Sequence, residues 1–308
     1  MKIPVIIFFI LSVFCCFHSY AQNLNLDSLL DVSAKKESPK KQYTEATFAG
    51  SRLIDGHTVE TPQAGVLSLL ISHRFGKINE GFYNMFGLDA ASMRIGLDYG
   101  ITNGLTIGGG RSTFEKQYDG FLKYRLLWQS EGEHKMPLSL TLLSSVMYET
   151  DTTALKSEKQ ISIYPRQTDK FSFAYQLLIA RKFSNAFSLQ LMPTMIHENI
   201  VYNASSSNDL FALGAGARIK LTPRSSLNFE YYYQLPGYKL PGTYNTFSIG
   251  YEIETGGHVF QLHLSNSTGM TERTVISENY GQWGNGDIHF GFNISRAFAI
   301  KKAKPVNY

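Results

Sequence analysis

The sequence predicts an all-β protein, a transmembrane antiparallel up-and-down β-barrel of about 12 strands in a bacterial outer membrane. Three observations support this fold: an N-terminal export signal, a long series of segments in which apolar and polar residues alternate, and connections that alternate between short and long. No stretch after the export signal approaches the roughly 18 consecutive apolar residues of a transmembrane helix. Strands are therefore expected to cross the membrane.

Residues 1–21 have the anatomy of a cleaved secretory signal peptide. Lys2 provides the basic start, and an apolar stretch leads to a small-x-small cleavage site that ends at Ala21. Both cysteines, Cys15 and Cys16, lie in this leader, and neither follows the small residues of a lipoprotein signal. Cleavage after Ala21 would leave a mature chain without cysteine, which excludes disulfides and Cys-ligated metals from it.

The mature chain has nearly balanced charge. Removing the leader leaves 287 residues and takes away one basic residue, so the formal charge falls from +4 to +3. This balance argues against nucleic acid as a partner. The expected partners are outer-membrane lipid, the barrel-assembly machinery and a periplasmic protein. We expect no cofactor and no metal, because no metal-ligand spacing joins the mature histidines, His57, His73, His134, His197, His258, His263 and His289.

Two segments precede the expected barrel. Residues 22–47 contain a lysine-rich run and are interpreted as a flexible periplasmic arm. Residues 48–64 carry Arg52, Asp55, His57 and Glu60 and are expected to form an N-terminal plug or a strand-like segment. The barrel would span 65–298, and a periplasmic tail, 299–308, would follow it.

Twelve segments of 8 to 13 residues show the two-residue alternation of strands with one apolar and one polar face. In one of them Met93, Ile95 and Leu97 point one way, while Arg94 and Asp98 point the other. A bilayer requires about 9 to 11 residues in a tilted strand. The segments are 65–75, 93–101, 105–112, 118–129, 138–149, 171–183, 187–197, 210–221, 227–235, 245–254, 258–265 and 287–298.

The connections alternate as in outer-membrane barrels, with short periplasmic turns and longer external loops. Most odd-numbered connections are long and most even-numbered ones are turns of three to five residues, with 113–117 and 130–137 as exceptions. This pattern places both termini in the periplasm. Phe82, Tyr83 and Phe86 in the first long loop are expected to cap the barrel, or else to contact a partner.

Several short motifs make the chain similar to an outer-membrane β-barrel family of unknown function found in Bacteroidetes. The resemblance covers about 48–298 and implies the barrel and the compartment, but no reaction. The motifs are Ser51-Arg52-Leu53-Ile54-Asp55-Gly56-His57, His73-Arg74-Phe75-Gly76, Phe86-Gly87-Leu88-Asp89, Gly109-Gly110-Arg111-Ser112, Asp119-Gly120-Phe121-Leu122-Lys123-Tyr124 and Gly257-His258-Val259-Phe260-Gln261-Leu262.

One pattern suggests catalysis. The run from His263 to Ser267 is similar to the H-x-S-N-G signature of outer-membrane phospholipase A, in which a histidine activates a serine. Ser267 stands in place of the glycine, and strand parity points His263 and Ser265 into the lumen, away from lipid. A lipid hydrolase is therefore the least favoured alternative, and we expect no enzyme.

Charged residues on the lumen-facing side carry the main functional hypothesis. Their nearly equal numbers allow either a plug of salt bridges or a narrow aqueous path. A narrow pore or small-solute transporter is the leading hypothesis, and a non-conducting structural or assembly barrel that binds an envelope partner is the alternative. The residues are Arg74, Arg94, Asp98, Asp119, Lys123, Arg125, Glu149, Arg218, Lys220, Glu230, Glu252 and Glu254.

Overall fold

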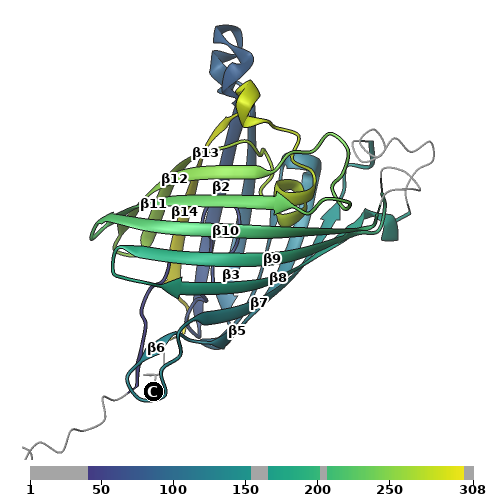
Figure 1. Ribbon diagram of the computed structural model, residues 1–308. Coiled ribbons are helices and arrows are strands. Elements are labelled where there is room, and N and C mark those ends of the chain that lie inside the picture. Colours follow the sequence, from purple (N-terminus) through teal and green to yellow (C-terminus); the bar gives the residue numbers. More distant parts are fainter. Residues whose placement is uncertain (1–40, 154–165, 202–206, 302–308) are drawn as a thin grey trace, which may run out of the picture. The chain divides into compact units, whose positions relative to one another are not determined.

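The computed structural model describes residues 41–153, 166–201 and 207–301, and in it twelve antiparallel strands close into a barrel (Figure 1). The predicted fold class and strand number are thus confirmed. The barrel strands are β2 (Val66–Lys77), β3 (Ala91–Gly100), β4 (Leu105–Ser112), β5 (Gln117–Leu127), β7 (Ser139–Glu149), β8 (Phe171–Lys182), β9 (Phe187–Glu198), β10 (Asp209–Thr222), β11 (Ser225–Gln234), β12 (Thr246–Thr255), β13 (His258–Ser265) and β14 (His289–Ala299).

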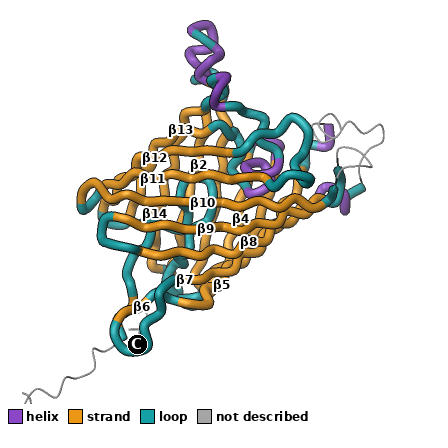
Figure 2. Tube along the Cα trace, in the orientation of Figure 1, coloured by secondary structure: helices purple, strands orange, loops and turns teal. Residues whose placement is uncertain are grey.

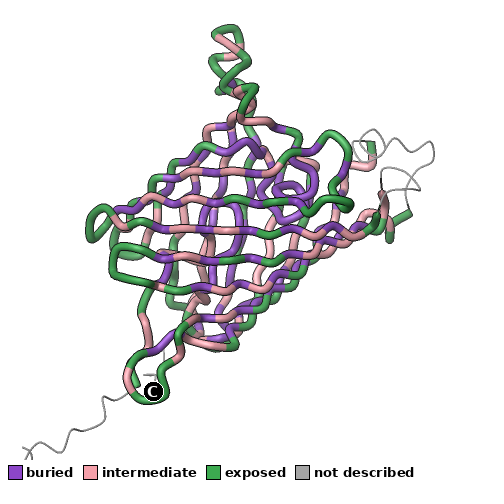
Figure 3. The backbone as a smooth tube through the Cα atoms, in the orientation of Figure 1, coloured by how far each residue is buried: buried purple, intermediate pink, exposed green. Residues whose placement is uncertain are grey.

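Each strand pairs with its neighbours in the chain, and β14 closes the barrel on β2 (Figure 2). Closure leaves none of these twelve strands with an unpaired edge, as a bilayer requires. Burial alternates along the strands, because successive side chains point to opposite faces (Figure 3). In β3, Arg94 and Asp98 are buried, while Ile95 and Leu97 are about half exposed. The exposed face is the apolar one, which is the arrangement of a barrel with lipid outside.

The two ends of the barrel differ in their connections. At the short-turn end, brief turns such as Gly256-Gly257 join the strands, and the described part of the chain both enters and leaves there. The longer 130–137 connection at this end has a reason: β6 (Ser130–Glu131) pairs with β1 (Gln42–Tyr43) in a two-stranded sheet. This sheet holds the chain just before it enters the lumen.

The long-loop end carries the short helical turns, which are η1 (Ile78–Glu80), η2 (Phe82–Gly87), η3 (Phe114–Lys116), η4 (Thr168–Lys170), η5 (Arg273–Ser277) and η6 (Trp283–Asn285). The lobe formed by η1 and η2 projects from the rim (Figure 2). Phe82 and Tyr83 in it are 78% and 93% exposed, so the expectation that they cap the barrel is wrong. No helix in the described ranges is long and apolar enough to span a membrane.

The lumen is filled by two chain segments that are not part of the wall. Residues 47–64 enter from the short-turn end, and most of 266–279 fold inward from the long-loop end. The second segment lies in the long connection 266–286, which the alternation of turns and loops predicts to be external, but η5 within it is completely buried. The predicted leader, most of the periplasmic arm (22–40) and the tail from 302 onward lie outside the described residues.

Candidate functional site

The first lumenal segment forms a tight hairpin, which we call the lumenal hairpin (residues 51–58). The amide of Leu53 donates to the carbonyl of Gly56 at 2.9 Å, and the amide of Thr58 donates to the carbonyl of Ser51 at 3.0 Å. An Asp-Gly pair in the turn is typical of such a reversal. The turn lies deep in the barrel, because Leu53, Ile54 and Asp55 are all buried.

Glu230 on β11 holds the tip of the hairpin. Its Oε2 accepts hydrogen bonds from the amides of Ile54 and Asp55, both at 3.0 Å, and its Oε1 accepts one from the amide of Gly56 at 2.7 Å. Hydrogen bonds to an ionised acceptor are stronger than neutral ones, and successive amides form a concave anion site. A Cβ at Gly56 would lie 2.1 Å from the hydroxyl of Tyr232, so only glycine fits at this contact.

Asp55 joins the tip to further strands of the wall. Its carboxylate pairs with Arg74 on β2 and accepts a hydrogen bond from Ser248 on β12 at 2.7 Å. Asn293 on β14 donates to the carbonyl of Ile54 at 2.8 Å. The tip therefore contacts the section of the wall that runs from β11 to β2, and every one of these contacts is polar.

The base of the hairpin and the residues after it are held in the same way. Ser51 donates to Asp98 at 2.7 Å, and Arg125 pairs with Glu60 at 3.1 Å. Gln190 makes a double contact: it accepts from the amide of Val59 at 2.8 Å and donates to the carbonyl of His57 at 2.7 Å. These contacts satisfy backbone groups that would otherwise be buried without partners.

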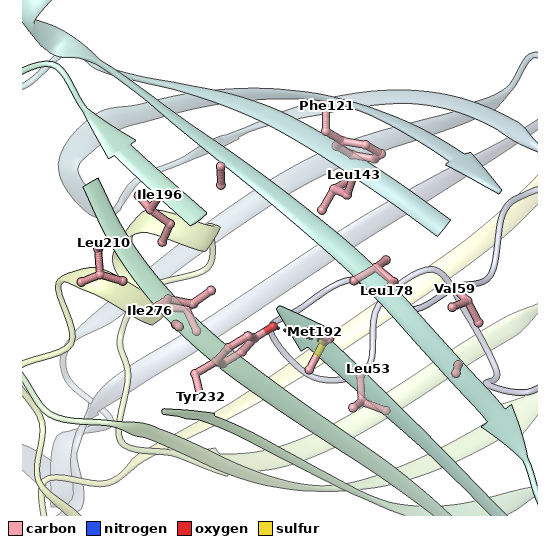
Figure 4. Packing of buried hydrophobic residues seen from close by; sticks show 14 of the residues in the cluster. Leu53, Val59, Phe121, Leu143, Leu178, Met192, Ile196, Leu210, Tyr232 and Ile276 are labelled. Carbon is pink, nitrogen blue, oxygen red and sulfur yellow. Dashed lines mark hydrogen bonds between the residues drawn. The ribbon is translucent and has the colours of Figure 1, made fainter. Parts of the chain in front are cut away.

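An apolar cluster lies on one side of the lumen, where strands β5 to β11 carry buried hydrophobic residues. Leu53 and Val59 of the N-terminal segment pack with Leu178, Met192 and other wall residues (Figure 4). The wall makes room with glycine: a Cβ at Gly216 would lie 2.4 Å from Leu53. The segment is thus fitted to the wall both by polar contacts and by shape.

The connection 266–288, whose first part forms the second lumenal segment, is called here the lumenal loop, and it meets the hairpin through Glu272. The Glu272 carboxylate lies 3.3 Å from His57 and 3.5 Å from Arg52, and it accepts a hydrogen bond from Ser145 at 3.2 Å. Burial alone would raise the pKa of Glu272, but contact with His57 and the charge of Arg52 hold it below its usual range. Burial, with a smaller effect of Arg52, lowers the pKa of His57, so the imidazole is neutral.

Arg273 binds a group of acidic side chains near the mouth of the barrel. Its guanidinium pairs with Glu115, with Glu149 at 3.0 Å and with Glu278 at 3.1 Å. Burial raises the pKa of Glu115 to about 8, and the negative charges of Glu278 and Glu149 act in the same direction, whereas Arg273 opposes them. The lumenal loop is therefore attached to the mouth by a cluster with more carboxyl groups than cations.

The predicted lumen charges all face inward, and most have partners in the structure. Arg94 pairs with Asp119 through two nitrogens, and Arg218 pairs with Glu252 at 3.4 Å and with Glu254. Lys123 donates to the carbonyl of Glu60. The contacts of Arg74, Asp98, Arg125, Glu149 and Glu230 are given above, and Lys220 is partly exposed beside a small cavity near the short-turn end.

His263 and Ser265 do not form a catalytic pair in this geometry. Both side chains are buried in the lumen, but neither ring nitrogen of His263 has a hydrogen-bond partner. The Ser265 hydroxyl is engaged elsewhere, by Ser248 at 2.8 Å and by the amide of Ser267 at 3.1 Å. Within the described ranges, no group of three or more His, Cys, Asp and Glu residues is arranged to hold a metal ion.

Sequence reasoning did not assign Glu115, Glu272 or Arg273 to the site, because they lie in connections rather than strands. The adjacent opposite charges of Glu272 and Arg273 in a loop were the available signal. A strand pattern gives no information on whether such a loop turns inward or outward.

Comparison with known proteins places the chain in a family. Residues 48–298 match the family model described as "Membrane bound beta barrel domain (DUF5777)". The chain belongs to this family. The matched range includes the lumenal hairpin as well as the barrel strands, so the hairpin is part of the family domain. No curated protein matches the sequence.

Solved structures with similar folds include outer-membrane proteins. The chain is 8% identical to the KdgM porin, with a TM-score of 0.47, covering 75% of this chain and 99% of that one. For the NanC porin the values are 7%, 0.45, 75% and 98%, and for the outer membrane protein Omp33 of Acinetobacter baumannii they are 6%, 0.42, 75% and 97%.

Proposed function

We propose that this membrane-bound barrel is a gated pore for small solutes in the bacterial outer membrane, and that the structure is its closed state. The hairpin and the lumenal loop would be the gate. In the closed state the cavities that border the hairpin are small, about 10 Å³ beside Asp55 and about 30 Å³ beside Ser51. Cavities of this size hold only one or two water molecules, so a solute would need the gate to move.

One observation carries the proposal: the wall leaves space that only the N-terminal segment fills. Barrel-wall glycines lie mostly on the lumen side, and three of them face this segment directly. A Cβ at Gly216 would meet Leu53, one at Gly100 would meet the backbone of Gln63, and one at Gly250 would lie 3.4 Å from Ile54. Withdrawal of the segment would thus leave an opening lined by charged and amide side chains.

The compartment follows from the leader expected at residues 1–21. With export and cleavage after Ala21, the short-turn end would face the periplasm, because outer-membrane barrels have short turns on that side. The hairpin would then enter the lumen from the periplasm, directly after the arm that ends at residue 47. A periplasmic partner that binds this arm could pull on the gate.

Conductance in planar bilayers tests the pore. We expect the wild-type protein to be closed most of the time and Glu230→Ala, which removes the acceptor for three hairpin amides, to open at least tenfold more often. Glu254→Ala, at the edge of the lumen, is the matched control and should resemble the wild type. If all three proteins are correctly folded and never conduct, the pore proposal is wrong.

A non-conducting structural barrel is the second candidate, and the apolar cluster favours it. Moving the hairpin would expose Leu53, Val59 and the wall residues that they cover to water, at about 25 cal/mol per Å² of apolar surface. This candidate predicts silent bilayers for every variant. No observation favours a lipid hydrolase, because His263 does not contact Ser265 and both are enclosed in the lumen.

A further inference from the structure

The hydrogen-bond ladder of the barrel wall is interrupted between β8 and β9. Pairing runs regularly to Gln176 opposite Thr194 and resumes at Ile179 opposite Leu191, but Leu177 and Leu178 are not paired with Pro193 and Met192. Pro193 is the seventh of twelve residues in β9, and proline has no amide hydrogen. On its other side β9 pairs with β10 without a break, including Leu213 opposite Pro193.

The interruption leaves a backbone acceptor without its donor. In an antiparallel ladder, Pro193 occupies the position that would donate to the carbonyl of Leu177. Proline within a sheet is normally confined to edges and bulges, whereas β9 is paired on both sides. An unpaired carbonyl in the hydrocarbon region of a membrane costs free energy, so the wall is weakened at this point.

A groove of about 750 Å³ opens on the outer face of the barrel at the same place. Its walls are almost entirely apolar and include Tyr124, Leu142, Tyr175, Leu177 and Pro193. The volume lies within the roughly 300–1,000 Å³ of small-molecule sites. The cavities in the lumen bordering the hairpin are more than tenfold smaller, so the groove is a separate feature from the gate.

The groove crosses the strands from β5 to β11, and at β10 and β11 it reaches the long-loop end. Pro193 lies at mid-strand, whereas Phe211 is the third residue of β10 and Leu235 directly follows β11 at the long-loop rim. A ligand anchored by a headgroup at this rim could therefore place a hydrocarbon chain along the groove. In a membrane-bound barrel, lipid is the molecule present at this face.

We propose that this groove is a binding site for one acyl chain of a membrane lipid in the leaflet on the long-loop side. The chain fills the apolar groove beside Pro193; it has no hydrogen-bond donor, so it does not replace the bond missing at Leu177. The site does not depend on whether the lumen conducts.

Lipid retention tests the site. The probe is 1-palmitoyl-2-oleoyl phosphatidylethanolamine, counted on the purified full-length protein by native mass spectrometry. We expect the wild type to retain one lipid and Ser144→Phe, which fills the groove, to bind it at least tenfold more weakly. Leu262→Phe is the control on the lipid-facing side of β13 and should retain lipid like the wild type. Equal retention by Ser144→Phe and the wild type would overturn the proposal.

A second variant separates binding from a folding defect. Pro193→Val restores an amide donor opposite Leu177, so its thermal unfolding midpoint in lipid-free detergent should rise above that of the wild type. Added lipid should raise the midpoints of the wild type and of Pro193→Val alike, because an acyl chain offers no hydrogen bond at Leu177, but should change that of Ser144→Phe much less. An equal rise in the wild type and in Ser144→Phe would mean that the lipid does not act at the groove.

Discussion

Glu230→Gln should release the tip of the lumenal hairpin without changing the wall. The carboxylate accepts hydrogen bonds from three amides, those of Ile54, Asp55 and Gly56, at 2.7 to 3.0 Å. An amide keeps only one acceptor oxygen, so one or two of these bonds are lost and those remaining lose their ionic character. At about 1.5–3 kcal/mol for each hydrogen bond to a charged group, the docked hairpin should lose roughly 2–5 kcal/mol.

Cysteine labelling measures this loss. Because the mature chain is expected to lack cysteine, Thr58→Cys places a single thiol at a completely buried hairpin position. At about 1.4 kcal/mol per factor of ten, the labelling rate with a maleimide should rise by about 30-fold to several thousand-fold in the Glu230→Gln background. Asn185→Cys at an exposed turn is the control and should label at one rate in both backgrounds. A Thr58→Cys rate that changes less than threefold would refute the role of Glu230.

Three other perturbations test the packing and charge of the lumen. Leu53→Ala leaves a cavity beside Gly216 and should lower the free energy of unfolding in detergent by about 2–5 kcal/mol, whereas Leu262→Ala on the lipid face should cost less; equal losses would contradict the packing. Because burial raises the pKa of Glu115 to about 8, its contribution to stability is complete below its unfolded pKa of about 4.5 and is lost as the pH rises to 8. Protease protection of the lumenal loop should therefore fall between about pH 4.5 and 8 and change little above that, and Glu115→Gln should reduce this dependence. Arg273→Ala leaves Glu115, Glu149 and Glu278 without their shared cation, so the loop should be cleaved at least tenfold faster at pH 8 and regain protection at pH 5; equal cleavage at both pH values would argue against the acidic cluster.

The barrel was predictable from the sequence because the residue pattern that specifies each strand lies within that strand. Alternation in a segment such as 93–101 follows from the two-residue period of a strand between lipid and lumen. The number of strands followed from counting such segments, and their inward charges from parity. The observed strand ends differ from the predicted ones by only a few residues: for example, the segment expected at 227–235 is β11, Ser225–Gln234.

The filling of the lumen was only partly predictable. The charges at Arg52, Asp55, His57 and Glu60 suggested a plug or a strand-like segment, but Glu230 as the anchor depends on contacts between residues 174 to 176 positions apart. The inward course of the lumenal loop depends on the pairing of Arg273 with Glu115 on η3 and Glu149 on β7. No local pattern encodes such contacts, because they exist only after the barrel closes.

The conductance of a variant whose lumenal hairpin is locked to the wall by a disulfide tests the central claim most directly. Leu53→Cys with Gly216→Cys places two thiols where the hairpin packs against β10. In planar bilayers, the oxidised protein should remain closed and reduction should restore openings at the frequency of the unlocked protein. If oxidised and reduced proteins conduct equally, with the disulfide verified by mass spectrometry, the lumenal hairpin is not the gate.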